Sequence, residues 1–214
     1  SSILSTKTLT SLSLILLFSS FPIFLGGDHS ITIPLVSAFS QTSPINFVML
    51  DAHADLLDIF LDYRIGHANV LRRILEFENV HEVFLIGTRS LEKEELDMLS
   101  HPKINVWTVD EFHEHDLSRI LSIIPNTRTY LSLDIDVVDP AFAPGTGIPD
   151  PGGITSYELL TLVREIMTQI NVVGMDIVEY APAQDVVADI TGFLCVKTIF
   201  EALTGLKKRN FKSK

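Results

Sequence analysis

Short runs of apolar, largely β-branched residues alternate along the chain with longer stretches in which apolar residues recur at helical spacing. The runs predict strands at 23–25, 45–50, 82–86, 104–108, 129–133 and 172–178. The periodic stretches predict helices over about 30–39, 67–77, 91–99, 116–124, 155–169 and 186–204. Several of the strands are apolar on both faces, which is typical of a sheet covered by helices on both sides. The pattern therefore predicts an α/β fold, a three-layer αβα sandwich around a mostly parallel sheet.

No repeat, charge block or glycine- and serine-rich linker divides the 214 residues, so we expect a single domain over 1–214. Residues 11–25 are strongly apolar. Their longest unbroken apolar run is nevertheless much shorter than the ~20 residues of a membrane-spanning helix, and Pro22 interrupts the stretch. We interpret it as a buried helix followed by a buried strand, and expect a soluble, cytoplasmic protein without a membrane partner.

The formal net charge is −11, from 16 basic and 27 acidic residues. Nucleic acid is an unfavourable partner for such a surface, whereas a cationic substrate would be attracted to it. Divalent cations bound among the carboxylates would offset part of the charge locally. The single cysteine, Cys195, lies in an apolar run, and we interpret it as a small buried hydrophobic residue in a reducing compartment.

Ionisable residues follow four of the predicted strands. His29 comes after strand 23–25, Asp51 after 45–50, Asp134 after 129–133 and Glu179 after 172–178. The carboxyl ends of parallel strands form one rim of the sheet, and ligands of such sheets bind in the crevice beyond that rim. We therefore expect these four side chains to meet at one site.

Two aspartate-rich segments predict what this site binds. One reads Asp51-Ala-His53-Ala-Asp55 and the other Asp134-Ile-Asp136. If the chain stays extended beyond each strand, alternate residues point in the same direction. Carboxylate oxygens with one or two imidazoles and no thiolate favour an octahedral ion such as Mn²⁺ over tetrahedral zinc. The alternative is that the acids are solvated turn residues, but together the segments predict a hydrolase with two metal ions.

The segment Gly-Gly-Asp28-His29-Ser is a weak signal by itself and gains weight only beside the two aspartate segments. Asp28 has two interpretations, as the acceptor that orients a ligand imidazole or as the cap of a helix. Asp139, which precedes Pro140, is better interpreted as a turn former than as a ligand.

These segments also resemble those of a known family. Gly-Gly-Asp-His-Ser, Asp-Ala-His-Ala-Asp, Ser-Leu-Asp-Ile-Asp-Val-Val-Asp-Pro and Gly-Met-Asp-Ile-Val-Glu-Tyr-Ala-Pro are similar, in this order, to the signatures of the ureohydrolases, which include arginases and agmatinases. The resemblance covers roughly residues 23–204. It implies a three-layer α/β fold, two Mn²⁺ ions per chain, and hydrolysis of a guanidino group to urea and an amine.

The resemblance implies a role for each matching residue. One ion would be held by His29, Asp51, Asp55 and Asp134, and the other by His53, Asp51, Asp134 and Asp136. A water between two such ions loses a proton near neutral pH and can attack the guanidinium carbon. Glu179 would pair with the guanidinium, Asp55 would help to pass a proton to the leaving amine, and His67 would shuttle protons. Ala68 follows His67 where the family usually has glycine.

The substrate is predicted from the loop at 56–66. Here the chain lacks the asparagine and serine with which arginases hold the substrate α-carboxylate, and it carries Asp58 and Asp62. The resemblance is therefore nearest to agmatinases and implies hydrolysis of agmatine to putrescine, a step of polyamine biosynthesis. The alternatives are another guanidino or formimino hydrolase, such as guanidinobutyrase or arginase, and a non-catalytic metal-binding relative. The chain is short at its amino end for an agmatinase, and the family implies a trimer or hexamer.

Overall fold

A single parallel sheet organises the computed structural model, which describes residues 20–186 and 188–212. Its strands lie in the order β1-β6-β5-β2-β3-β4, and all neighbours pair in parallel. The strands are β1 (Ile23–Leu25), β2 (Ile45–Leu50), β3 (Val80–Thr88), β4 (Ile104–Thr108), β5 (Thr129–Asp134) and β6 (Val172–Val178). The six predicted strands are confirmed, although β3 is longer at both ends than expected.

Helices connect the strands. The α-helices are α2 (Thr32–Thr42), α3 (Val70–Ile74), α4 (Leu96–Leu99), α5 (Val109–Glu114), α6 (Leu117–Ser122), α7 (Ser156–Gln169) and α8 (Ile190–Lys212). Short 3₁₀ turns are η1 (His29–Ile31), η2 (His67–Asn69), η3 (Lys93–Glu95) and η4 (Ile135–Val137). Helix α5 was not predicted, and the last helix begins and ends later than expected. The helix expected near the start of 11–25 lies outside the described residues.

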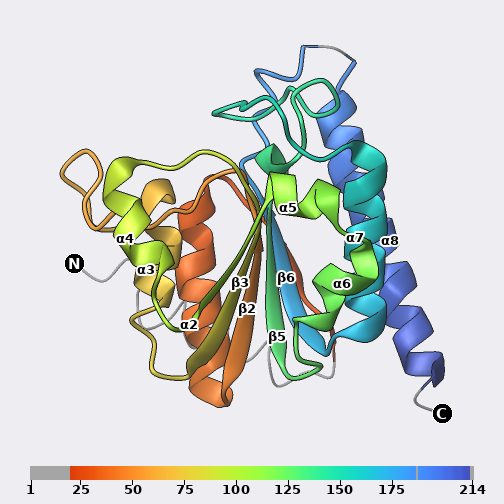
Figure 1. Cartoon of the computed structure of the whole chain (residues 1–214). Coiled ribbons are helices and arrows are strands. Elements are labelled where there is room, and N and C mark those ends of the chain that lie inside the picture. The colour runs from red at the N-terminus through yellow and green to blue at the C-terminus, as the bar shows by residue number, and fades with distance from the viewer. Residues whose placement is uncertain (1–19, 187, 213–214) are drawn as a thin grey trace.

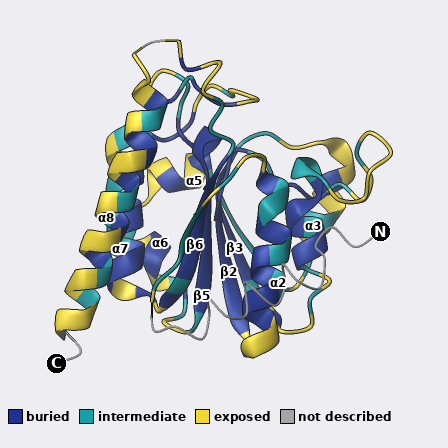
Figure 2. Cartoon of the chain, turned by 180° about the vertical axis from the view of Figure 1, so that it is seen from behind, coloured by how far each residue is buried: buried dark blue, intermediate teal, exposed yellow. Residues whose placement is uncertain are grey.

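Helices cover both faces of the sheet, which confirms the three-layer αβα prediction. Helices α2, α3 and α4 lie on one side, and α5, α6, α7 and α8 lie on the other (Figure 1). Strands β2 and β5 are buried along their whole length, as strands in the middle of a covered sheet must be (Figure 2). Among the described residues, no helix is long and apolar enough to span a membrane.

Strand β1 is less buried than the sequence predicted. It lies at the edge of the sheet and pairs only with β6 among the described strands, so Leu25 is 68% exposed and the strand is not a buried one. The polar residues that follow β1 nevertheless lie at the same rim as those that follow β2, β5 and β6, because all four strands run in the same direction.

Candidate metal centre

The register of the central strands brings the aspartates together. Leu50 of β2 is paired with Leu133 of β5, so the next residues, Asp51 and Asp134, emerge side by side from the rim of the sheet. Asp134 is in turn paired with Val178 of β6, which places Glu179 on the next strand end. The prediction that residues following four strands meet at one site is confirmed.

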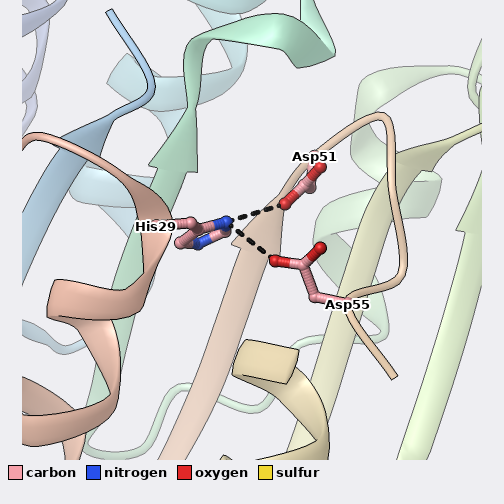
Figure 3. A group of neighbouring side chains, drawn as sticks. All are labelled: His29, Asp51 and Asp55. Atoms are coloured by element: carbon pink, nitrogen blue, oxygen red, sulfur yellow. Dashed lines mark ion pairs between the residues drawn. The ribbon is translucent and has the colours of Figure 1, made fainter. Parts of the chain in front are cut away.

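His29 is surrounded by three carboxylates. Its Nδ1 atom lies 3.0 Å from Oδ2 of Asp51, 3.2 Å from Oδ2 of Asp55 and 3.3 Å from Oδ2 of Asp134. Figure 3 shows the imidazole pointing at Asp51 and Asp55, which reach it from the chain that follows β2. All four side chains are buried. We refer to His29, Asp51 and Asp55, with the adjoining Asp134, as the first cluster.

A second cluster lies next to the first. Nδ1 of His53 is 2.9 Å from Oδ2 of Asp136 and 3.6 Å from Oδ1 of Asp51. Asp51 therefore turns one carboxylate oxygen toward each imidazole and belongs to both clusters. This is the geometry expected of a carboxylate shared by two adjacent cations.

A buried network determines which nitrogen of His29 faces the carboxylates. The Ser132 hydroxyl donates to Oδ1 of Asp176 at 2.6 Å, so its oxygen is left to accept a hydrogen bond from Nε2 of His29 at 3.0 Å. Thr32 and Tyr130 also donate to Asp176, through hydroxyls that lie 2.9 Å from Oδ2. With Nε2 carrying a proton, the neutral imidazole presents the Nδ1 lone pair to the cluster, as a metal ligand must.

Two atoms of the first cluster have no hydrogen-bond partner among the described residues, although both are buried: Nδ1 of His29 and Oδ2 of Asp51. Buried polar atoms are rarely left unpaired, and these two face each other across the cluster. They are the atoms that a cation would contact. The donor set of carboxylate oxygens and imidazole nitrogens, with no thiolate, fits a pair of divalent cations.

The pKa shifts of the acidic and imidazole groups also indicate that the clusters bind cations. Burial and the neighbouring charge of Asp51 raise the pKa of Asp55 to about 7, and burial followed by the Asp136 and Asp51 charges raises the pKa of Asp134. Burial opposes the charged form of His29, but the three carboxylates that face Nδ1 outweigh it and raise the pKa of the imidazole. Without cations, protons supply the positive charge that these carboxylates need. Metal ions would displace those protons.

The local backbone differs from the extended chain that the sequence suggested. Asp55 has φ = 52° and turns back toward His29 from a left-handed conformation, which aspartate adopts more readily than most residues. Asp136 lies in the 3₁₀ turn η4, and its backbone N–H donates to the Asp134 carboxylate at 2.9 Å. The ligand candidates therefore converge through tight turns rather than by strand alternation.

Asp28 and Asp139 have structural roles. The Asp28 carboxylate accepts from the N–H of Ser30 and caps η1, so the capping interpretation is the correct one, and Ser132 is the partner of the imidazole. Asp139 accepts hydrogen bonds from the backbone of Ala141 and Gly152, which confirms it as a turn former.

A cavity of about 390 Å³ opens over the two clusters. It is lined by His29, His53, Asp55, Leu57, Phe60, His67, Ala68, Ser90, Glu92, Glu95, Asp134, Asp136, Gly147, Ile148 and Glu179. The structure thus places all the candidate site residues except the fully buried Asp51 in the wall or floor of one cavity. No lysine or arginine lines it among the described residues.

Glu179 is held in a defined position in this wall. Its Oε1 atom accepts a hydrogen bond of 2.6 Å from the backbone N–H of His29, and its backbone has φ = 61°. A positive φ costs a glutamate of the order of 1–3 kcal/mol, and such strain is concentrated at functional sites. Burial raises the pKa of the carboxyl group.

Asp58, which the sequence suggested as a substrate-binding acid, does not line the cavity. Its carboxylate forms an ion pair of 2.5 Å with Arg73 and also lies near Arg64. Asp62 does not line the cavity either. Two acidic residues in the wall, Glu92 and Glu95, were not predicted from the sequence. Glu95 is buried and accepts a hydrogen bond from the backbone N–H of Leu56, whereas Glu92 is exposed. Cys195 is buried, as predicted, and burial raises the pKa of its thiol to about 12.

Comparisons with known proteins agree with this geometry. The model of the arginase family matches residues 6–205. The agmatinase of Bacillus subtilis is 37% identical over 191 residues, and the agmatinase of Bacillus cereus is 35% identical over 190 residues. In both cases the match covers 88% of this chain and 64% of the relative, so the chain spans somewhat less than two thirds of the length of these agmatinases. Arginase 1, mitochondrial, of Arabidopsis thaliana is 31% identical over 196 residues, which are 87% of this chain and 55% of that protein.

Solved structures share the fold. The agmatine ureohydrolase of Thermoplasma volcanium has a TM-score of 0.85 at 27% identity, covering 96% of this chain and 69% of the other. Proclavaminate amidino hydrolase from Streptomyces clavuligerus has a TM-score of 0.84 at 32% identity, covering 98% of this chain and 73% of the other.

Proposed function

We propose that this chain, which belongs to the arginase family, is a two-metal amidinohydrolase that cleaves a guanidino group to urea and an amine. The observation that carries the proposal is the pair of clusters that share the buried Asp51 at the base of a cavity that Glu179 also lines. We propose Mn²⁺ as the metal, with one ion held by His29, Asp51, Asp55 and Asp134 and the other by His53, Asp51, Asp134 and Asp136.

Each group has a distinct task in this reaction. Two divalent cations would lower the pKa of a water molecule so that it can act as a nucleophile at neutral pH. Glu179 binds the guanidinium by a planar, charge-assisted pairing and fixes the carbon under attack. Asp55 and His67 line the same cavity, which supports our proposal that they pass a proton to the leaving amine.

The lining of the cavity favours agmatine, which would yield putrescine. Arginine and guanidinobutyrate carry a carboxylate at the end remote from the guanidino group, and the described lining residues include no lysine, arginine or asparagine to bind it. Agmatine carries an ammonium at that end instead. Glu92 in the wall and the net charge of −11 both favour a cation. The similarity to two Bacillus agmatinases supports the same choice.

The test is urea release by the Mn²⁺-loaded protein from agmatine, arginine and guanidinobutyrate at equal concentrations. We expect turnover of agmatine with the highest kcat/KM. Glu92→Gln should raise the KM for agmatine about 2- to 5-fold, as expected for a solvated charge pair, and Glu94→Gln should leave it unchanged, because Glu94 does not line the cavity. Preferred turnover of guanidinobutyrate or arginine would contradict agmatine as the substrate. A metal-loaded protein that releases urea from none of them would favour the non-catalytic relative.

A further inference from the structure

Arg89 is a buried cation whose side chain binds backbone oxygens. It follows β3, and its side chain is 7% exposed. The guanidinium donates to the carbonyls of Asp136 at 2.7 Å, Val137 at 3.1 Å, Gly87 at 3.3 Å and Asp150 at 2.6 and 3.2 Å. These five contacts use every N–H donor of the guanidinium. Two of them hold the turn that carries Asp136.

The backbone at Arg89 holds the other loop of the second cluster. The N–H groups of Arg89 and Ser90 both donate to the carbonyl of Ala52, at 2.9 and 3.0 Å. Ser90 also forms a bridge with His53. Ala52 in turn donates its N–H to Oδ1 of Asp136 at 3.1 Å. One residue therefore binds both loops, through its backbone on the His53 side and its side chain on the Asp136 side.

From this arrangement we propose that Arg89 is a positioning residue that sets the spacing between His53 and Asp136, and so determines the affinity of the second metal site. The inference rests on the proposed two-metal centre. It is specific to the second cluster, because no hydrogen bond or ion pair joins the Arg89 side chain to His29 or Asp55 in the described structure.

The chemistry of the contact requires arginine. Lysine has three donors on a single nitrogen and cannot reproduce the planar fork that reaches carbonyls on two loops. The packing around the fork is also close, because a Cβ at Gly153 would lie 2.8 Å from Nη2 of Arg89 and 2.6 Å from the carbonyl oxygen of Val137. The absence of a side chain at Gly153 therefore leaves the room that the guanidinium occupies against this turn.

The experiment is calorimetric titration of metal-stripped protein with Mn²⁺, comparing the wild type with Arg89→Lys. We expect the variant to bind its first ion with wild-type affinity and its second ion about 10- to 100-fold more weakly, the usual loss when a group that supports a metal ligand is removed. Arg128→Lys is the matched control. Arg128 also donates to backbone carbonyls, those of Phe39 at 3.0 Å and Ser43 at 2.8 Å, but it lies at the opposite end of the sheet, just before β5.

Four results would overturn the inference: equal weakening of both sites in Arg89→Lys, no weakening of either, the same selective loss in Arg128→Lys, or an Arg89→Lys protein that fails to fold while Arg128→Lys folds. The last would show a general structural role. Failure of the proposed function is a different result, because it would appear in the wild type as binding of fewer than two ions.

Discussion

Asp51→Asn tests the sharing of one carboxylate between the two clusters. Asparagine has nearly the same shape, and its oxygen can still accept the 2.7 Å hydrogen bond that Oδ1 of Asp51 accepts from the backbone N–H of His53. The variant therefore removes the charge and one metal-binding oxygen with little change of backbone. Since Asp51 faces both imidazoles, we expect loss of both metal ions, whereas Asp55→Asn should weaken only the first site and Asp136→Asn only the second.

The expected loss of folding stability in Asp51→Asn has two parts, one that depends on bound metal and one that does not. Each ion at a concentration of 100 times its Kd stabilises the folded state by about 2.7 kcal/mol. Two ions contribute about 5 kcal/mol, which at about 2–4 °C per kcal/mol for a chain of this size raises Tm by about 10–20 °C. The second part acts without metal. Burial opposes ionisation of Asp51, but His29 and His53 outweigh it and lower its pKa from 3.8 to about 2.

A depressed carboxyl pKa stabilises the fold above the unfolded pKa, and this stabilisation is lost as pH falls through the folded pKa. At pH 7.5 the contribution of Asp51 is therefore fully present and amounts to about 2 kcal/mol. The variant should lose it even when no metal is added.

Thermal denaturation at pH 7.5, with EDTA or with saturating Mn²⁺, separates the two parts. In EDTA the Asp51→Asn protein should melt about 4–8 °C below the wild type. Adding Mn²⁺ should raise the Tm of the wild type by about 10–20 °C. It should raise the Tm of Asp55→Asn and Asp136→Asn by about half as much, and that of Asp51→Asn by almost nothing. If Mn²⁺ raised the Tm of Asp51→Asn as much as that of Asp55→Asn or Asp136→Asn, the inference that both metal sites share the Asp51 carboxylate would be refuted.

Three further results are expected. Glu179→Gln should lower kcat/KM for agmatine by about 100-fold or more, the usual effect of removing one partner of a buried charge pair, with metal content unchanged; loss of the metals would contradict its substrate-binding role. Asp176→Asn should weaken the first metal site in titrations and spare the second, because Asp176 acts through Ser132 on His29 alone; a selective loss at the second site would disprove that path. Cys195 should resist a thiol-specific reagent at pH 8 until the protein unfolds, because burial keeps the thiol protonated; rapid labelling of the native protein would be inconsistent with this.

Several features of the site follow directly from the sequence. Apolar runs end at Leu50 and near Leu133, and the parallel register then places Asp51 beside Asp134. This step needs only the strand ends and the shared direction of the strands, so the ionisable residues could be assigned to one rim before the fold was known.

Other features depend on contacts that the sequence does not contain. Asp55 reaches His29 through a left-handed turn, and the pairing of Asp58 with Arg73 removes it from the cavity. Arg89 contacts residues about fifty positions away, so its role becomes visible only in three dimensions. One feature of the sequence could have identified Asp176. It is a carboxylate inside the apolar run of β6, which indicates a buried acid that needs hydrogen-bond donors.

The expected trimer or hexamer and the cytoplasmic location stay predictions, as does a single domain over 1–214. Sedimentation of the metal-loaded protein would measure its assembly state, which the sequence alone suggested only through the family resemblance.

Anomalous diffraction from crystals of the Mn²⁺-loaded protein would show whether the two clusters hold a pair of metal ions. We expect two anomalous peaks on either side of the Asp51 carboxylate, one contacting His29 Nδ1 and Asp55 and the other contacting His53 Nδ1 and Asp136. A single peak, or peaks away from these side chains, would contradict this expectation.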